Sequence, residues 1–190
     1  MKITAWNSNG LQQRALEIKT FIYNNNIHIL LVSETHFIPK SYMKIPYYTI
    51  YGTKHPSGKA HGGAAVILRN DIKHYLHSQV NKEYIQATTV TVQTSSNYFQ
   101  LSAVYVPPRH KITSQMWEEY FQDLGDKYIA AEDYNSKHTL WGSRNTRPRE
   151  HWKNTLEIIT SIYYPQEHRH IGRLTWTKNQ IFWTLQLQGN

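Results

Sequence analysis

The pattern of hydrophobic and polar positions predicts short strands and few helices. Lys2–Trp6 alternates and predicts a first strand, and Ile27–Val32 is a continuous apolar run typical of a strand buried on both faces. Between them, Gln12–Tyr23 carries apolar residues at near-helical spacing, which predicts a helix ending at the three asparagines 24–26. The chain is therefore expected to open with strand, helix and strand.

The centre of the chain is rich in β-branched and aromatic residues, which favour strands. We expect strands at 47–51, 63–68, 71–76, 84–93 and 97–106, with a solvated loop at 53–62. Pro107 and Pro108 cannot donate to a strand ladder and so end the last of these strands. Ser114 is the expected N-cap of an amphipathic helix to Leu124, and Arg149–Ile162 has a second helical pattern.

A short buried strand is predicted at Tyr128–Ala131, followed directly by Glu132, Asp133 and Asn135. Residues two apart on a strand point to the same side of the sheet, so Asp133 and Asn135 would share one face at the strand end. Asp133 could order a metal ion or activate a water, and Asn135 could donate to a phosphate oxygen. Asp-x-Asn alone is more often a turn, so its significance depends on the rest of the chain.

The run of strands from Tyr47 to Val106 lies between helix-containing ends. This order favours one domain of two sheets packed face to face with helices outside, rather than a parallel βαβ fold. Hydrophobic residues make up 39% of the 190 residues and charged residues 18%, which excludes wholesale disorder.

The sequence contains no cysteine, which excludes disulfides, a disulfide-linked partner and a thiolate metal site. No apolar run approaches the ~20 residues of a membrane-spanning helix, and Met1 leads directly into a strand pattern rather than a signal peptide. We therefore expect an intracellular protein, nuclear or cytoplasmic, without a membrane partner. Nothing in the sequence indicates the oligomeric state.

The formal net charge is +8, and from Lys137 onward eight Lys and Arg face three Asp and Glu. A basic region interleaved with aromatic residues is compatible with a nucleic acid partner but is not specific for one.

Four strand ends carry polar motifs in a fixed order: Trp-Asn-Ser-Asn-Gly (6–10), Ser-Glu-Thr-His (33–36), Tyr-Val-Pro-Pro (105–108) and Asp-Tyr-Asn-Ser-Lys-His (133–138). Together they resemble the endonuclease/exonuclease/phosphatase superfamily, and within it the apurinic-endonuclease-like domain of non-LTR retrotransposons of the jockey type. The resemblance covers roughly residues 1–150 and fades beyond Tyr164.

The resemblance implies an α/β (α+β) fold, a four-layer αββα sandwich of two mixed sheets, that cleaves DNA phosphodiester bonds with Mg²⁺, or with Mn²⁺ in its place. By position, Glu34 is the metal ligand and Asn7 supports it. Asp133 would orient or deprotonate the attacking water, and Asn135 and Tyr105 would hold the scissile phosphate.

Four further residues are the expected substrate contacts: Asn9, Arg109, Lys137 and His138. Asn9 stands where some relatives of this class carry Asp, which makes a metal role for it less secure. His36 is expected at the surface or on a DNA strand rather than on the metal.

The chain departs from the family pattern at two places. Glu132 replaces a small residue before Asp133, where it either crowds the neighbouring carboxylate or points away. The family also ends with a Ser-Asp-His motif, whereas this sequence has no Asp after Asp133 and no Ser after Ser161. We therefore expect a truncated copy with a domain at 1–165, a divergent tail at 166–190, missing closing strands and little or no cleavage.

The sequence supports two functions of different classes. One is a Mg²⁺-dependent DNA endonuclease domain of a retrotransposon, and the alternative is an inactive remnant that at most binds nucleic acid. A third, a superfamily branch acting on phospholipids or inositol phosphates, is weakened by the Tyr-Val-Pro-Pro and Asp-Tyr-Asn-Ser-Lys-His motifs. The sequence does not show a target site or a reverse transcriptase.

Overall fold

The computed structural model describes residues 1–95, 97–133, 172–177 and 180–186, in which two sheets are packed together. The strands of the first sheet, in spatial order, are β3 (Tyr48–Thr53), β4 (Ala64–Arg69), β2 (Ile29–Ser33), β1 (Lys2–Asn7), β10 (Gln180–Gln186) and β9 (Gly172–Thr177). The strands of the second are β5 (His74–Lys82), β6 (Ile85–Gln93), β7 (Tyr98–Tyr105) and β8 (Tyr128–Asp133). Both sheets are mixed, because β1 is parallel to β2 and β7 is parallel to β8.

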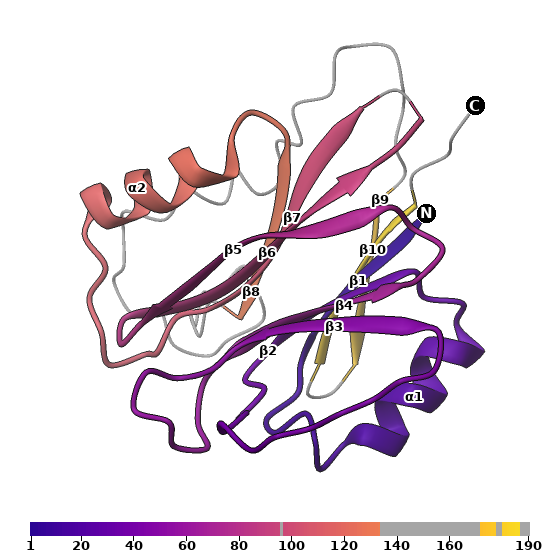
Figure 1. Cartoon of the computed structure of the whole chain (residues 1–190), viewed down its shortest axis with the longest axis horizontal. Helices are drawn as coiled ribbons and strands as arrows, with labels where there is room; N and C mark the ends of the chain where they lie inside the picture. The colour runs from indigo at the N-terminus through magenta and orange to yellow at the C-terminus, as the bar shows by residue number, and fades with distance from the viewer. Residues whose placement is uncertain (96, 134–171, 178–179, 187–190) are drawn as a thin grey trace.

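Two helices cover the outer faces of the sheets (Figure 1). Helix α1 (Ala15–Asn24) packs Ile18 and Ile22 on the first sheet, and α2 (Ser114–Leu124) packs Tyr120 and Leu124 on the second. The layers therefore run helix, sheet, sheet, helix, and the predicted αββα sandwich is confirmed. The helix predicted at Arg149–Ile162 lies outside the described residues.

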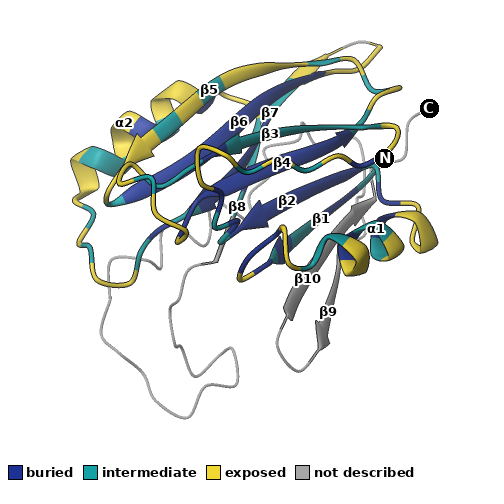
Figure 2. Cartoon of the chain, turned by 60° about the horizontal axis from the view of Figure 1, so that its bottom comes forward, coloured by how far each residue is buried: buried dark blue, intermediate teal, exposed yellow. Residues whose placement is uncertain are grey.

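The central core lies between the two sheets, where β2, β4 and β6 are buried over nearly their whole length (Figure 2). The first sheet contributes Ile29, Leu31 and Val66 to this core, and the second contributes Val90 and Leu101. Burying one such side chain stabilises the fold by about 1.5–3 kcal/mol. The continuous apolar run predicted to be buried on both faces is therefore β2, whose five residues are all buried.

Hydroxyl groups join the two sheets next to this apolar core. Thr53 Oγ1 donates to the Ala87 carbonyl at 2.8 Å, and Thr88 Oγ1 donates to the Ala64 carbonyl at 3.0 Å. The two hydroxyls are also 2.8 Å apart. Because buried hydroxyls need partners, these contacts specify how the sheets are aligned.

Several predicted boundaries were wrong, and two of these errors have a physical explanation. The N-cap of α2 is Thr113 rather than Ser114, because Thr113 has the extended backbone of a cap and its hydroxyl accepts from the Met116 N–H. Strand β5 begins at His74 rather than residue 71 and continues to Lys82. The missed half is polar because β5 is an edge strand whose side chains are largely exposed, so it has little hydrophobic signal.

The expectation that closing strands are missing is corrected by the structure. Strand β10 pairs antiparallel with β1, and β9 pairs with β10, so both extend the first sheet. β9 alternates apolar and polar residues, as in Leu174-Thr175-Trp176, and β10 carries the apolar run Ile181-Phe182-Trp183. The expectation failed because it rested on the absent Ser-Asp-His motif rather than on these patterns.

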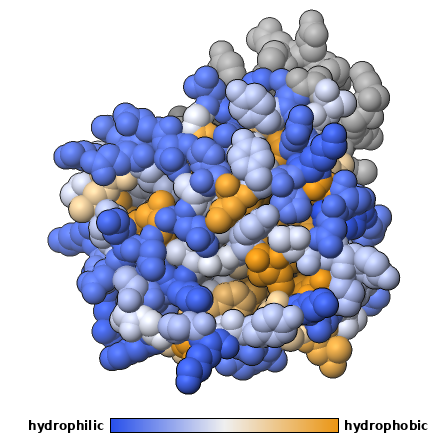
Figure 3. All heavy atoms as spheres, in the orientation of Figure 1, coloured by the Kyte–Doolittle hydropathy of each residue, from blue (hydrophilic) through white to orange (hydrophobic). Residues whose placement is uncertain are grey.

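Hydrophilic residues cover most of the face shown in Figure 3, and hydrophobic residues show between them in smaller patches. Within the described part of the chain, neither helix has the length and apolar character needed to cross a membrane.

His28 makes the stability of the fold depend on pH. Its Nδ1 accepts the N–H of Lys2 at 3.1 Å. Burial, the nearby Arg69 guanidinium and the N-terminal amine lower the pKa of His28 below its ordinary value of 6.5, against a smaller opposing effect of Asp71. The unfolded chain therefore binds the proton more tightly, and stability is lost as the pH falls from above 6.5 through the lower pKa of the folded state.

We expect His28→Asn to reduce this loss, because the amide oxygen keeps an acceptor for Lys2 and does not titrate. The measurement is urea unfolding of both proteins at pH 7.5 and pH 5.5. An identical drop in unfolding free energy for the two proteins would contradict this role of His28.

Candidate active site

Backbone hydrogen bonds join the ends of β1 and β2 at one rim of the sandwich. Asn7 pairs with Ser33 in the parallel register, and beyond it the Ser8 N–H donates to the Ser33 carbonyl at 3.0 Å. The Gly10 N–H donates to the Glu34 carbonyl at 2.8 Å, and Ser8 Oγ donates to the same carbonyl at 2.9 Å. The first two predicted motifs are therefore joined through their backbones.

The backbone at this rim is strained. Asn9, Glu34 and His36 have φ of 39°, 53° and 54°, the left-handed region that residues other than glycine rarely adopt. Such residues cost about 1–3 kcal/mol each and cluster at functional sites. Two kinds of hydrogen bond maintain this conformation. Gly10 and Ser8 donate to the Glu34 carbonyl, and the backbone N–H groups of the next two residues, Thr35 and His36, donate to carbonyls of another loop.

The Glu34 side chain is 19% exposed, and its Oε2 lies 3.9 Å from His36 Nε2. Burial lowers the pKa of His36, the Glu34 carboxylate opposes this effect, and His61 lowers the pKa further. The imidazole is therefore neutral near pH 7 and does not pair as a cation with the Glu34 side chain.

A pair of glycines brings the second sheet to this rim. The N–H groups of His36 and Thr35 donate to the carbonyls of Gly62 and Gly63, at 2.9 and 3.3 Å. The Gly63 N–H in turn donates at 3.2 Å to Oε1 of the fully buried Gln86, on β6. The Gln86 Nε2 donates to the Lys82 carbonyl at 2.6 Å. One buried amide therefore connects both sheets.

Tyr105 lies directly against this glycine pair. A Cβ at position 62 would lie 2.9 Å from Tyr105 Cε1 and 2.5 Å from Gln86 Oε1, so only glycine leaves room for the phenol ring. Tyr105 is half-buried at the end of β7 and pairs with Asp133 at the end of β8. The backbone position of Asp133 is thereby placed beside Tyr105, at the rim that also carries Asn7 and Glu34.

The remaining predicted site residues fall into two groups. Asn9 is exposed on the loop after β1, and Arg109 is exposed four residues beyond Tyr105. Asn135, Lys137 and His138 lie outside the described residues, so their predicted roles stay predictions.

Sequence analysis missed a group of histidines next to the site. The rings of His55 and His61 lie 3.8 Å apart between centroids. Burial lowers the pKa of His55. The nearby His61 and His110 lower this pKa further, whereas Glu83 raises it. The histidine content of loop 53–62 was the available signal, but nothing local shows that this loop contacts the end of β2.

The donor set at the rim suits a hard cation. Glu34 supplies a carboxylate and Asn7 a carboxamide oxygen, which accepts the Asn9 N–H at 3.0 Å. Within the described ranges, no three His, Cys, Asp or Glu side chains gather as a metal cluster. Mg²⁺ is commonly held by one or two carboxylates and retains several waters, so it fits this arrangement better than Zn²⁺.

The fold is that of the endonuclease/exonuclease/phosphatase proteins. The endonuclease domain of TRAS1, a telomere-specific non-LTR retrotransposon, superposes with a TM-score of 0.64 over 97% of this chain and 84% of that domain, at 18% identity. The AP endonuclease LMAP from Leishmania major gives a TM-score of 0.63 over 96% of this chain and 78% of that enzyme, at 15% identity.

The sequence, more particularly, resembles mobile-element proteins of the jockey type. It is 35% identical over 164 residues to the RNA-directed DNA polymerase from mobile element jockey of Drosophila funebris, and 34% identical to that of Drosophila melanogaster. Each match covers 86% of this chain, which spans only 18% of either relative. No family model matches the sequence.

Gly62 gives a test of this geometry. We expect Gly62→Ala to lower the unfolding free energy by about 1–3 kcal/mol beyond the cost of its backbone strain, because the new methyl displaces Tyr105 or Gln86. Gly58→Ala is the matched control, since Gly58 also has positive φ, 71° against 58°, but meets only Pro39, at 3.9 Å. Urea unfolding checks the difference, and equal losses for both variants would contradict the predicted crowding.

Proposed function

We propose that this chain is a Mg²⁺-dependent DNA endonuclease domain of a non-LTR retrotransposon. The observation that supports it most directly is the meeting of the Glu34 loop, Tyr105 and the end of β8 at one rim. The endonuclease-like fold and the mobile-element relatives support the same function. The net charge of +8 is complementary to a DNA backbone.

Glu34 and Asn7 would hold the metal ion, with Mn²⁺ able to replace Mg²⁺. When bound, the ion would stabilise the negative charge that develops on the phosphate oxygens. The neutral state of His36 favours this role, because the imidazole does not compete as a cation for the Glu34 carboxylate.

The other residues would act on the phosphate and on the water. The Tyr105 hydroxyl would donate to a phosphate oxygen from its fixed place beside Gly62. Asp133, beside Tyr105 in the β7–β8 register, would accept the proton of the attacking water. Asn135 would donate to the same phosphate, and Asn9, Arg109, Lys137 and His138 would contact the flanking DNA strand.

We propose a low rate for this site. The 190 residues contain no Ser-Asp-His motif, so they lack the histidine and the orienting aspartate that this motif supplies in the family. Losing a general acid or base costs roughly 10²–10⁴-fold in rate. The same observation favours the second candidate, an inactive remnant that binds nucleic acid through its basic surface.

In the element as a whole, a nick made by this domain would provide the DNA end from which an RNA-directed DNA polymerase starts synthesis. This step agrees with the names of the relatives, which are RNA-directed DNA polymerases from mobile elements. The domain would then act on DNA in the nucleus.

We expect slow nicking of supercoiled plasmid with Mg²⁺ or Mn²⁺ and none with a chelator. Glu34→Gln and Asp133→Asn should each lower the rate by roughly 10²-fold or more, because each removes a charge used on the metal or on the water. Glu118→Gln, an exposed carboxylate on α2, is the matched control and should leave the rate unchanged.

Each outcome of this assay separates the candidates. Nicking that persists in Glu34→Gln contradicts the proposed site. Binding of labelled duplex DNA without any metal-dependent nicking supports the remnant instead. Fast nicking that disappears in Glu34→Gln supports the endonuclease and contradicts the low rate.

A further inference from the structure

A hollow lies at the end of the first sheet opposite to the candidate active site. It has a volume of about 260 Å³ and is lined by Ile22, Tyr23, Asn26, Tyr47, Tyr48 and Arg69. Strand β4 runs from Ala64, beside the glycine pair, to Arg69, so six residues at roughly 3.4 Å each separate the hollow from the candidate active site. The two sites therefore do not overlap.

The aromatic walls of this hollow are fixed by hydrogen bonds. Tyr48 donates its hydroxyl to the Ile27 carbonyl at 2.6 Å, and Tyr23 donates to the Pro46 carbonyl at 2.9 Å. The rings of Tyr23 and Tyr48 meet edge to face, with centroids 6.1 Å apart. These rings are thus pre-organised and lose little freedom when a flat ligand stacks on them.

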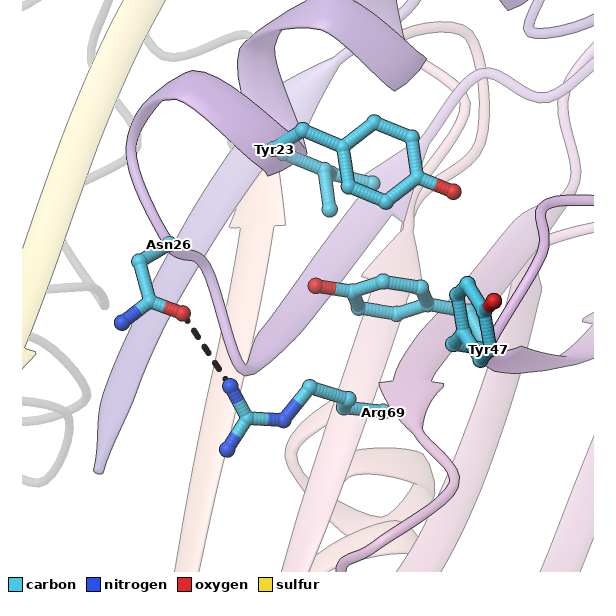
Figure 4. Close-up of a pocket in the computed structure, with 6 residues that line it drawn as sticks. Tyr23, Asn26, Tyr47 and Arg69 are labelled. Carbon is cyan, nitrogen blue, oxygen red and sulfur yellow. Dashed lines mark hydrogen bonds between the residues drawn. The ribbon is translucent and has the colours of Figure 1, made fainter.

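A guanidinium group is held in the same hollow. Arg69 donates through Nε to Asp71 at 2.7 Å and through Nη1 to Asn26 at 3.0 Å. Figure 4 shows the Asn26–Arg69 pair and the rings of Tyr23 and Tyr47 around one space. The N–H groups of Arg69 outside these two bonds suit a ligand anion.

Tyr47 has an unusual conformation for its residue type. Its φ is 65°, which is rare for a bulky side chain, and the residue is 78% exposed where it lines the hollow. The Asn70 N–H donates to the Tyr47 carbonyl at 2.9 Å and holds this backbone in place. Asn26 also has positive φ, 48°, but an asparagine just after a helix commonly does.

We propose that this hollow binds one unpaired nucleotide of a single-stranded nucleic acid, with the base stacked on the tyrosine rings and a phosphate on Arg69. The volume suits one ring-sized group, since it lies below the roughly 300–1,000 Å³ of pockets for larger ligands. The net charge of +8 favours a polyanion over an isolated aromatic compound. This inference rests on the proposed endonuclease function only for the choice of nucleic acid as the partner.

The test is fluorescence anisotropy of the whole chain with labelled octamers of rU and dT, which separate RNA from DNA as the source. Tyr47→Gly should weaken binding of at least one octamer by roughly 5- to 150-fold, as expected when a stacked base loses its ring. The same change relieves a positive φ and should raise resistance to urea. A merely structural tyrosine would not give weaker binding together with greater stability.

Two further variants complete the test. Arg69→Gln should weaken binding. It should also reduce the slope of log affinity against log salt concentration by about one, as expected for the loss of one phosphate contact. Tyr98→Ala, at a tyrosine 67% exposed on the other sheet, is the matched control and should bind like the unmodified chain. Unchanged affinity in Tyr47→Gly, or an equal loss in Tyr98→Ala, overturns the proposal. Binding of the octamers is measured with a chelator present, so the outcome does not depend on nicking.

Discussion

The inner faces of the two sheets determine the rest of this structure. Ile29, Leu31 and Val66 of one sheet pack on Val90 and Leu101 of the other, and a one-residue slip of any of these strands would turn these side chains to the outer face of its sheet. The alignment is therefore specified along each strand and across the two layers. Because strand ends are placed by this alignment, polar groups that follow the strands arrive at the same rim, where backbone hydrogen bonds join the first two motifs.

Much of this arrangement could be predicted from local sequence. The apolar run before Glu34 and the prolines after Tyr105 mark strand ends, and a strand end is where a polar side chain can leave the core without an unpaired buried charge. The layers also followed from the order of helices and strands. These features depend on neighbours within a few residues, which is why periodicity was sufficient.

Contacts between distant residues were not predictable in this way. Gly63 and Gln86 are 23 residues apart, and no sequence pattern at either position predicts the hydrogen bond between them. The same holds for Arg69 and Asn26, 43 residues apart. The polar half of β5 and the strands β9 and β10 were missed for other reasons. The first has little hydrophobic contrast, and the other two were judged by an absent motif instead of by their apolar residues.

Gln86 has a consequence for how motion travels through the molecule. Its amide joins the carbonyl of Lys82, beside the turn between β5 and β6, to the N–H of Gly63, and a packed interior transmits displacement instead of absorbing it. An outward displacement of that turn would therefore move Gly62 and Gly63, whose carbonyls accept hydrogen bonds from the N–H groups of His36 and Thr35. The β5–β6 hairpin is thus joined through a single side chain to the backbone that binds the Glu34 loop, although it carries no residue of the site itself.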